Sequence, residues 1–320
     1  MNAKLIRQVV SLFLLATLLA ACGKPTAIPT KSPPQPTSPP EIQPTEPPAP
    51  SDTPALTDAP APTATPEPKF PPEPQRVEFQ AEDGINLVGY YYPAAVDPAP
   101  ALVLMHWAGG THCDWIAVNL VQWAQNRGLP EGIAANPACA NAELRIPDSL
   151  AEFPPLPEGQ SYAIFAFDYR GYGESEDSAN WDPSGYLKDS IAAVKTAQRL
   201  EGVDPNRVAT IGASIGADGA IDACAEGCLG ALSLSPGNYL GVDYAGAVKA
   251  LGAEQKPAWC VASKQDGESY PKCQNASGDF FQKFIYEENG HGMSLFASSF
   301  DPKVTQIIFD FMRLVFGGSD

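Results

Sequence analysis

The sequence has few positive charges and very few histidines. Only 20 Lys and Arg stand against 37 Asp and Glu, which gives a formal net charge of −17. This balance excludes the basic surface that nucleic-acid binding requires, and it favours neutral or cationic ligands over anionic ones. With only three histidines in the chain, His106, His112 and His291, a reaction that needs an imidazole base has few candidates.

The N-terminal segment has the features of an export signal. Residues 1–21 carry two basic side chains followed by an apolar run at 9–21, which is typical of a signal peptide. Residues 19–22, Leu-Ala-Ala-Cys, resemble the lipobox of bacterial lipoproteins, in which Cys22 becomes the lipidated first residue. Acyl chains on Cys22 would anchor the protein to the cell membrane and leave its bulk outside the cytoplasm. A plain signal peptide with an incidental Cys22 is the alternative.

Residues 22–75 contain almost no large apolar side chains. The stretch holds more than half of the 34 prolines, along with many Thr, Ser and Ala, so it cannot bury enough surface to fold. Pro-rich chains stay extended at about 3.1 Å per residue, so this linker could hold a domain up to roughly 150 Å from the membrane. We interpret it as a disordered spacer.

Residues 76–320 are sufficient for one α/β domain, and no internal repeat divides them. Nearly continuous apolar runs are typical of strands covered on both faces of a parallel sheet, and amphipathic helical patterns separate them. Residues 77–80 and 85–92 predict an antiparallel hairpin. We therefore expect a doubly wound, mostly parallel sheet with an N-terminal hairpin. The apolar runs are 101–105, 162–167, 208–211, 229–234 and 258–262.

Two Asp-Pro pairs mark expected helix starts. Asp182 and Asp301 are each followed by proline and then by an amphipathic pattern. We expect each Asp to be an N-cap and each Pro to occupy the first helical position.

The segment Gly212-Ala213-Ser214-Ile215-Gly216 lies between a predicted strand and a predicted helix. A serine at the apex of such a turn has its hydroxyl pushed outward, and the flanking glycines avoid collisions with neighbouring elements. Because a serine hydroxyl is a poor nucleophile until a base takes its proton, we expect a histidine beside Ser214.

His291 is the best-placed base. It lies between two glycines ahead of the C-terminal helix, and a Gly-flanked loop permits close approach to Ser214. Asp266, after the run at 258–262, is expected to fix the tautomer of the imidazole. Glu268 and Asp243 are the alternatives for this carboxylate.

The other two histidines receive structural roles. We expect His106 to shape its loop by hydrogen bonding and His112 to make a surface or loop contact. Asp168 follows a buried run, and together with Arg170 it is expected to lock the turn after that strand.

A tetrahedral intermediate needs two backbone N–H donors. One is expected from Ile215, the residue after the nucleophile. The other is expected from Trp107 or Ala108, in the loop after the run at 101–105.

These segments together resemble the α/β-hydrolase superfamily, closest to its dienelactone hydrolase-like and small serine esterase members. The resemblance covers about residues 76–318 and implies the α/β-hydrolase fold and a triad of Ser214, Asp266 and His291. The chain departs from the family at Trp107, where glycine is usual. The segments are His106-Trp107-Ala108-Gly109-Gly110, Asp168-Tyr169-Arg170-Gly171-Tyr172-Gly173-Glu174-Ser175, the turn at Ser214, Ser263-Lys264-Gln265-Asp266-Gly267 and Asn289-Gly290-His291-Gly292.

Six cysteines remain when Cys22 is set aside, an even number that suits an oxidising compartment. Sequence neighbourhood favours three disulfides. The absence of paired C-x-x-C spacing disfavours a metal site, and the spare histidines are not expected beside the cysteines, so we predict no metal and no cofactor. The favoured pairs are Cys113 with Cys139, Cys224 with Cys228, and Cys260 with Cys273.

Residues 127–160 form a longer connection than the fold needs and contain six prolines. Long connections in compact domains are often functional. This one is either a lid over the substrate pocket or a disulfide-pinned surface loop.

The sequence therefore predicts a lipid-anchored, extracytoplasmic serine hydrolase that forms an acyl-enzyme, with a small carboxylic ester as its first-choice substrate. A peptidase or acyltransferase would use the same triad. The alternative from another class is a non-catalytic, envelope-tethered binding protein that keeps the fold. Nothing in the sequence indicates an oligomeric state.

Overall fold

A computed structural model describes residues 69–178 and 182–317. The predicted signal peptide, the lipidation site Cys22 and the spacer up to residue 68 lie outside these ranges. None of the helices within them has the length and apolar character needed to cross a membrane. Residues at the end of the predicted spacer contact the domain, because Arg127 donates to the Phe70 carbonyl and Gln125 to the Pro72 carbonyl.

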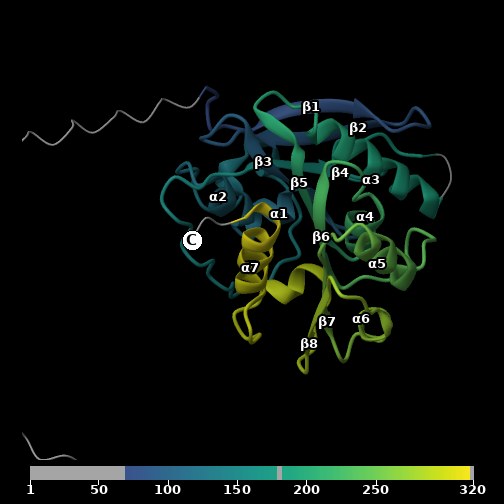
Figure 1. Cartoon of the computed structure of the whole chain (residues 1–320). Coiled ribbons are helices and arrows are strands. Elements are labelled where there is room, and N and C mark those ends of the chain that lie inside the picture. Colours follow the sequence, from purple (N-terminus) through teal and green to yellow (C-terminus); the bar gives the residue numbers. More distant parts are fainter. Residues whose placement is uncertain (1–68, 179–181, 318–320) are drawn as a thin grey trace, which may run out of the picture. The chain divides into compact units, whose positions relative to one another are not determined.

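Eight strands form one sheet in the order β1-β2-β4-β3-β5-β6-β7-β8 (Figure 1). β1 and β2 make the predicted antiparallel hairpin, and β2 also pairs antiparallel with β4. All other neighbours are parallel. The strands are β1 Gln75–Gln80, β2 Asn86–Tyr92, β3 Ala99–Met105, β4 Ala163–Asp168, β5 Val203–Ala213, β6 Cys228–Leu234, β7 Ala258–Ser263 and β8 Phe281–Tyr286.

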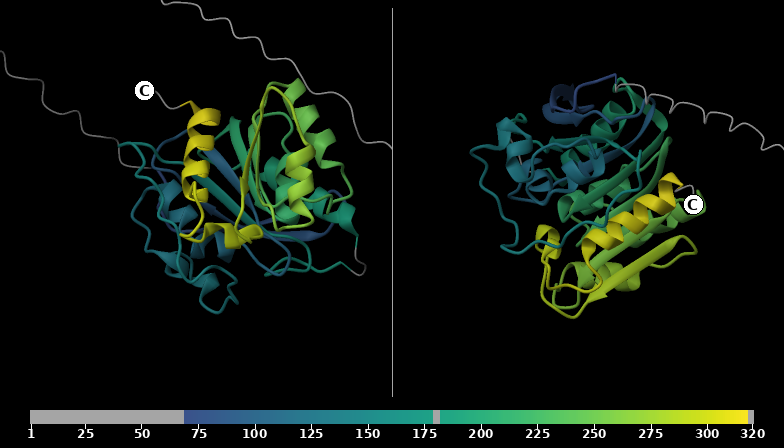
Figure 2. Two further views of the ribbon diagram at one scale, coloured as in Figure 1. Left: turned by 90° about the horizontal axis from the view of Figure 1, so that it is seen from below. Right: turned by 90° about the vertical axis from the view of Figure 1, so that its left-hand side faces the viewer.

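Helices cover both faces of the sheet, as the buried central strands require. Helices α1, α2 and α7 pack on the face that carries Leu102 and Leu104, whereas α3 and α4 pack on the face that carries Val103 and Met105. In Figure 2, α7 and the green helices α5 and α6 lie on opposite sides of the strands. The helices are α1 Cys113–Ala117, α2 Leu120–Gln125, α3 Pro183–Ala197, α4 Ile215–Asp222, α5 Tyr244–Ala253, α6 Ser269–Asn275 and α7 Val304–Phe316, with 3-10 turns η1 Gly132–Ala135, η2 Pro137–Cys139 and η3 Gly292–Phe296.

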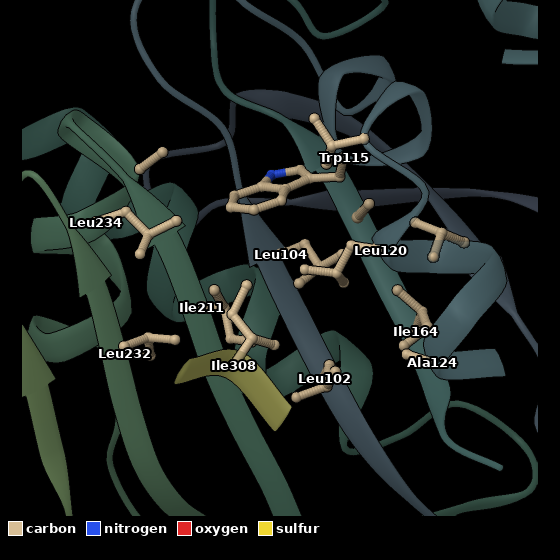
Figure 3. Close-up of a cluster of buried hydrophobic side chains, with 14 of the residues drawn as sticks. Leu102, Leu104, Trp115, Leu120, Ala124, Ile164, Ile211, Leu232, Leu234 and Ile308 are labelled. Atoms are coloured by element: carbon tan, nitrogen blue, oxygen red, sulfur yellow. The ribbon is translucent and has the colours of Figure 1, made fainter. Parts of the chain in front are cut away.

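The core on the α7 face is built from aliphatic side chains of four neighbouring strands (Figure 3). These side chains meet residues of α1, α2 and α7, and each fully buried Leu or Ile contributes about 1.5–3 kcal/mol. The core holds the strands in register and so fixes the loops at their ends. The labelled residues are Leu102, Leu104, Trp115, Leu120, Ala124, Ile164, Ile211, Leu232, Leu234 and Ile308.

One of the two predicted helix starts is confirmed. Asp182 caps α3 by accepting from the Ser184 amide, with Pro183 at the first position. The prediction for Asp301 is wrong, because α7 begins at Val304 with Lys303 as its N-cap. The Pro302 carbonyl instead accepts from the hydroxyl of Tyr286 at the end of β8, which keeps the Asp-Pro pair in the preceding loop.

The carboxyl ends of the parallel strands meet at one edge of the sheet, where such folds gather their functional groups. Ser214 directly follows β5, Asp266 follows β7 and His291 follows β8. The loop that begins at His106 follows β3. Four segments that are far apart in the sequence therefore end at the same edge.

Candidate active site

Ser214 occupies a strained turn between β5 and α4. Its backbone angles are φ 53° and ψ −116°, which a residue with a side chain rarely adopts. A Cβ on Gly212 would lie 1.8 Å from the Gly216 carbonyl oxygen, and a Cβ on Gly216 would lie 2.1 Å from the Met105 carbonyl oxygen. The turn therefore needs both glycines, as the sequence predicts.

Ser214, His291 and Asp266 form a continuous hydrogen-bonded chain. Ser214 Oγ lies 2.9 Å from His291 Nε2, and His291 Nδ1 lies 2.7 Å from Asp266 Oδ2. Because the carboxylate can only accept, the imidazole proton sits on Nδ1. Nε2 is then free to accept the serine proton, which is the arrangement that activates a hydroxyl.

Asp266 is held as a carboxylate. Burial opposes its ionisation, but hydrogen bonds from His291 and from Ser269 hold its pKa below the usual range. Its other oxygen, Oδ1, accepts from the backbone amides of Glu268 and Ser269. The group is thus fixed in both charge and orientation.

The two alternative carboxylates lie elsewhere. Glu268 is at the N-cap position of α6 and faces Lys272 at 3.9 Å. Asp243 caps α5 by accepting from the Gly246 amide. Only Asp266 of the three contacts His291 among the described residues.

The loop that carries His291 is fixed by two serines that the sequence analysis did not single out. The His291 amide donates to Ser294 Oγ at 2.7 Å, and the Gly292 amide donates to Ser235 Oγ at 3.0 Å. Ser235 is buried and has φ 58°. No sequence pattern marks Ser235, because it lies far from His291 along the chain.

The loop after β3 approaches the start of α4. A Cβ on Gly216, in the first turn of α4, would lie 2.1 Å from the Met105 carbonyl oxygen and 2.6 Å from the His106 carbonyl oxygen, so the start of α4 packs against the end of β3 and the first residue of this loop. Since Ile215 is the first residue of α4, its amide has no partner within the helix. The amide remains available as a donor, and the partial positive charge at the N-terminus of α4 also favours a negative oxygen at this position.

His106 shapes this loop by hydrogen bonding, as expected. Its Nδ1 lies 2.7 Å from the Trp107 carbonyl, and its Nε2 accepts from the Tyr169 amide at 3.0 Å. Burial lowers the pKa of His106, which keeps the ring neutral. The Trp107 carbonyl also accepts from the Gly110 amide at 3.1 Å, and Gly109 has φ 80°, so residues 107–110 form a tight turn.

Trp107 stands beside the base. Its ring centroid lies 6.5 Å from that of His291, and its indole Nε1 donates to Asp114 Oδ2 at 3.0 Å. The same oxygen accepts from the Thr111 amide at 3.3 Å. Asp114, which the sequence analysis missed, is buried, and that burial raises its pKa.

The prediction that His112 makes a surface or loop contact is wrong in part, because the residue is buried. Its amide and its Nδ1 both contact Asp168 Oδ1, at 2.8 Å and 2.9 Å. The expectation that no spare histidine lies beside a cysteine is also wrong. His112 Nε2 lies 3.5 Å from Cys113 Sγ and 3.4 Å from Cys139 Sγ.

Asp168 and Arg170 both hold the turn after β4, as expected, but each does so through partners of its own. Asp168 Oδ2 accepts from the Glu174 amide. The Arg170 amide donates to Asp189, and its guanidinium forms ion pairs with Asp189 and Asp83.

The three disulfides pair as sequence neighbourhood favours: Cys113–Cys139, Cys224–Cys228 and Cys260–Cys273. The last joins β7 to α6 and so braces the loop that carries Asp266. A disulfide that closes a loop of this size contributes about 3 kcal/mol in the chain-entropy description.

Residues 127–160 are pinned to the rest of the domain at two points, Cys139 and Leu150. The Cys113–Cys139 disulfide ties the segment to α1, and Leu150 forms a β-bridge with Ala297 just after η3. Between these points, the Arg145 guanidinium lies over Gly109, where an added Cβ would meet it at 3.3 Å. These contacts favour the pinned loop over the freely moving lid.

No protein-family profile matches the chain. Two similar curated proteins are both named "Uncharacterized protein YfhR". The Escherichia coli K12 protein is 27% identical over 158 residues, which cover 48% of this chain and 42% of that protein. The Salmonella typhi protein is 27% identical over 173 residues, 52% of this chain and 46% of that protein. The chain therefore aligns with less than half the length of these relatives.

Several solved structures share the fold. The esterase Pf2001 of Pyrococcus furiosus matches with a TM-score of 0.53 at 14% identity, over 77% of this chain and 91% of that chain. DcsB in complex with its substrate analogue matches with a TM-score of 0.52 at 13% identity, over 77% of this chain and 100% of that chain. The α/β hydrolase GrgF from Penicillium sp. sh18 matches with a TM-score of 0.51 at 15% identity, over 77% of this chain and 99% of that chain. At these identities the likeness establishes the α/β-hydrolase fold.

Proposed function

We propose that this chain is a serine hydrolase that cleaves carboxylic esters through an acyl-enzyme. The observation that carries the proposal is the hydrogen-bonded chain from Asp266 through His291 to Ser214, whose strained turn holds the hydroxyl within hydrogen-bond distance of the imidazole. Catalytic triads are recognised by such geometry and roles. The esterases among the structures with this fold, and the resemblance to dienelactone hydrolase-like and small serine esterases, are consistent with it.

In the acylation step, Ser214 Oγ attacks the ester carbonyl while His291 Nε2 takes its proton. The Asp266 carboxylate stabilises the imidazolium that forms. His291 then donates this proton to the leaving alcohol, and the ester C–O bond breaks. In the second step, His291 takes a proton from water, whose oxygen attacks the acyl carbonyl. The bond from that carbon to Ser214 Oγ then breaks, His291 returns the proton to Oγ, and the acid leaves.

The negative oxygen of each tetrahedral intermediate needs donors that are already in place. The Ile215 amide supplies one, with the positive end of α4 behind it. The amide of Trp107 or Ala108 supplies the other, in a turn that neutral His106 holds through the Trp107 carbonyl. Loss of one such donor typically costs about 3 kcal/mol in the barrier.

The substrate we propose is a small ester that reaches the site from solvent. The His291 side chain is 37% exposed, and the Trp107 ring lies beside it. The net charge of −17 favours neutral or cationic esters. A peptidase or an acyltransferase would use the same triad, and the choice of acceptor and leaving group separates them from an esterase.

The same proposal places the protein outside the cytoplasm, anchored through Cys22. A lipobox-like sequence and a Pro-rich spacer support this location. Incorporation of labelled palmitate into the full chain, abolished by Cys22→Ser, is the expected result. Equal incorporation by the variant would remove the anchor from the proposal.

A fluorophosphonate probe tests the activated serine directly. The full chain is expected to be labelled, and Ser214→Ala and His291→Ala are expected to abolish labelling while they retain the wild-type circular dichroism. Hydrolysis of a series of p-nitrophenyl esters then measures the chain length that the site accepts. A folded, disulfide-intact protein that neither reacts with the probe nor cleaves esters would instead support the non-catalytic binding protein.

A further inference from the structure

A second buried cluster lies directly after the turn at 107–110, and the proposed reaction does not use it. It joins His112 and Asp168 to the Cys113–Cys139 disulfide. All four residues are at most 3% exposed. The cluster is therefore a shielded group of one imidazole, one carboxylate and two sulfur atoms.

The orientation of His112 in this cluster is fixed. Its Nδ1 donates to Asp168 Oδ1 at 2.9 Å, because the carboxylate can only accept. Its ring stacks on that of Tyr90, with centroids 4.5 Å apart and planes inclined at 22°. The proton on Nδ1 leaves a lone pair on Nε2, which faces both sulfurs and, at 3.5 Å, the side-chain nitrogen of Asn136.

Both sulfurs lie at the distance that separates two ligands of one metal ion. His112 Nε2 is 3.5 Å from Cys113 Sγ and 3.4 Å from Cys139 Sγ. In a tetrahedral zinc site, bonds of about 2.0 Å to nitrogen and 2.3 Å to sulfur place such atoms about 3.5 Å apart. Only the two sulfurs, which are bonded to each other, must separate.

Asp168 adds the partner that metal-binding histidines usually have. Such histidines donate their other ring N–H to a carboxylate or carbonyl, which fixes the tautomer and makes the ligand nitrogen more basic. Asp168 already does this for His112. Its own position is fixed by the amides of His112 and Glu174.

We propose that reduction of the Cys113–Cys139 disulfide converts this cluster into a zinc site, with His112 Nε2 and the two cysteine thiolates as ligands. A phosphine or dithiol reductant supplies two electrons, and with two protons the S–S bond becomes two thiols. Zn²⁺ binding then releases both thiol protons to solvent. Water completes the four-coordinate site.

The other two disulfides provide matched controls. Cys224–Cys228 and Cys260–Cys273 also yield thiol pairs on reduction. The histidines other than His112 are engaged elsewhere, His106 with the Trp107 carbonyl and His291 with Ser214 and Asp266. A nitrogen and two sulfurs therefore converge at only one of the three disulfides, within the described residues.

Cobalt titration of the reduced full chain tests the site, because Co²⁺ replaces Zn²⁺ and its thiolate complexes absorb visible light. The reduced protein is expected to bind one Co²⁺ per chain with a tetrahedral thiolate spectrum, which added Zn²⁺ removes. The oxidised protein is expected to give no such spectrum. Asp168→Asn is expected to keep the spectrum and weaken the affinity by about 10–100-fold.

Variants locate the ligands. Cys113→Ser with Cys139→Ser, and separately His112→Gln, are expected to abolish the one-equivalent tetrahedral spectrum. Cys224→Ser with Cys228→Ser, and Cys260→Ser with Cys273→Ser, are expected to keep it. Cobalt binding that does not depend on His112, as an unfolded reduced chain would show, overturns the proposal, and so does a folded reduced chain that binds no Co²⁺.

Discussion

The indole Nε1 of Trp107 donates a 3.0 Å hydrogen bond to Asp114 Oδ2, and this bond fixes the orientation of the indole beside His291. A Cβ on Gly110 would lie 2.1 Å from that carboxylate oxygen and 2.4 Å from the indole. The hydrogen bond between Trp107 and Asp114 therefore requires a residue without a side chain at position 110. A Cβ on Gly292 would lie 3.0 Å from the indole. The pair therefore connects the turn at 107–110 to the loop of His291.

Asp114→Ala is expected to lower kcat/KM for a p-nitrophenyl ester by about 10–100-fold, because a shift of the neighbouring donors by about 1 Å has effects of this size. Trp107→Phe removes the same hydrogen bond and is expected to act in the same direction. The double variant is expected to be little worse than Asp114→Ala alone, since the two changes break one interaction. Asp114→Asn, which keeps an acceptor, is the control. Fully additive losses would show that the two residues act independently.

Asp266→Asn is expected to reduce kcat about 10⁴-fold, because an amide in place of the carboxylate favours the wrong imidazole tautomer. Glu268→Gln and Asp243→Asn are expected to stay within a few-fold of wild type, since neither side chain contacts His291. Steady-state hydrolysis of one ester by all three variants makes the comparison. A large loss of kcat in either control variant, together with an active Asp266→Asn variant, would assign the role of orienting His291 to that other carboxylate.

Gly216→Ala is expected to lower the free energy of unfolding by about 3 kcal/mol or more, because its Cβ would collide with the Met105 carbonyl and backbone atoms cannot easily move aside. The matched control is Gly252→Ala in α5, where nothing lies within 4 Å of the added Cβ. That change is expected to stabilise the protein by about 0.5–1 kcal/mol. Thermal unfolding of both variants measures the difference, and equal effects would contradict the proposed packing of α4 on β3.

Asp222 makes the stability depend on pH. Burial, and then the charge of Asp218, raise the pKa of Asp222 to about 8, and its Oδ1 is buried without a hydrogen-bond partner. A carboxyl group whose pKa is higher in the folded state binds more protons there, so its effect on stability becomes unfavourable as pH rises from about 4 to about 8.

Asp222→Asn is therefore expected to raise the free energy of unfolding by several kcal/mol at pH 8.5, since each unit of pKa shift corresponds to about 1.4 kcal/mol, and by much less at pH 5. Urea unfolding at the two pH values gives the comparison. Asp279→Asn, at an exposed loop position, is the control and is expected to change neither value. A gain of equal size at both pH values would remove ionisation as the cause.

The sequence predicted the sheet, the nucleophile turn and the disulfide pairs because each leaves a local pattern. Continuous apolar runs indicate strands that are buried on both faces. The two glycines around Ser214 indicate a turn that has no space for side chains at their positions. The start of α7 was predicted incorrectly: the helix begins at Val304, and the Pro302 carbonyl accepts from Tyr286 on β8, a contact that no local pattern shows.

Other parts of the site depend on residues that come together only in the folded chain. Ser235 holds the loop of His291 by accepting from the Gly292 amide, 57 residues away in sequence, and nothing in the sequence neighbourhood of Ser235 marks it. His112 looked like a loop residue, yet the chain buries it between Asp168 and a disulfide. Pairings between distant segments depend on how the core sets the strand ends.

By itself, the sequence determined which chemical groups are present and which local turns they occupy, because glycine, proline and apolar spacing act over a few residues. Only the tertiary structure decided which carboxylate meets His291 and which histidine meets a pair of sulfurs. Those choices follow from the order of strands in the sheet. That order places segments more than 75 residues apart within hydrogen-bond distance, as for Ser214 and His291, which are 77 residues apart in sequence.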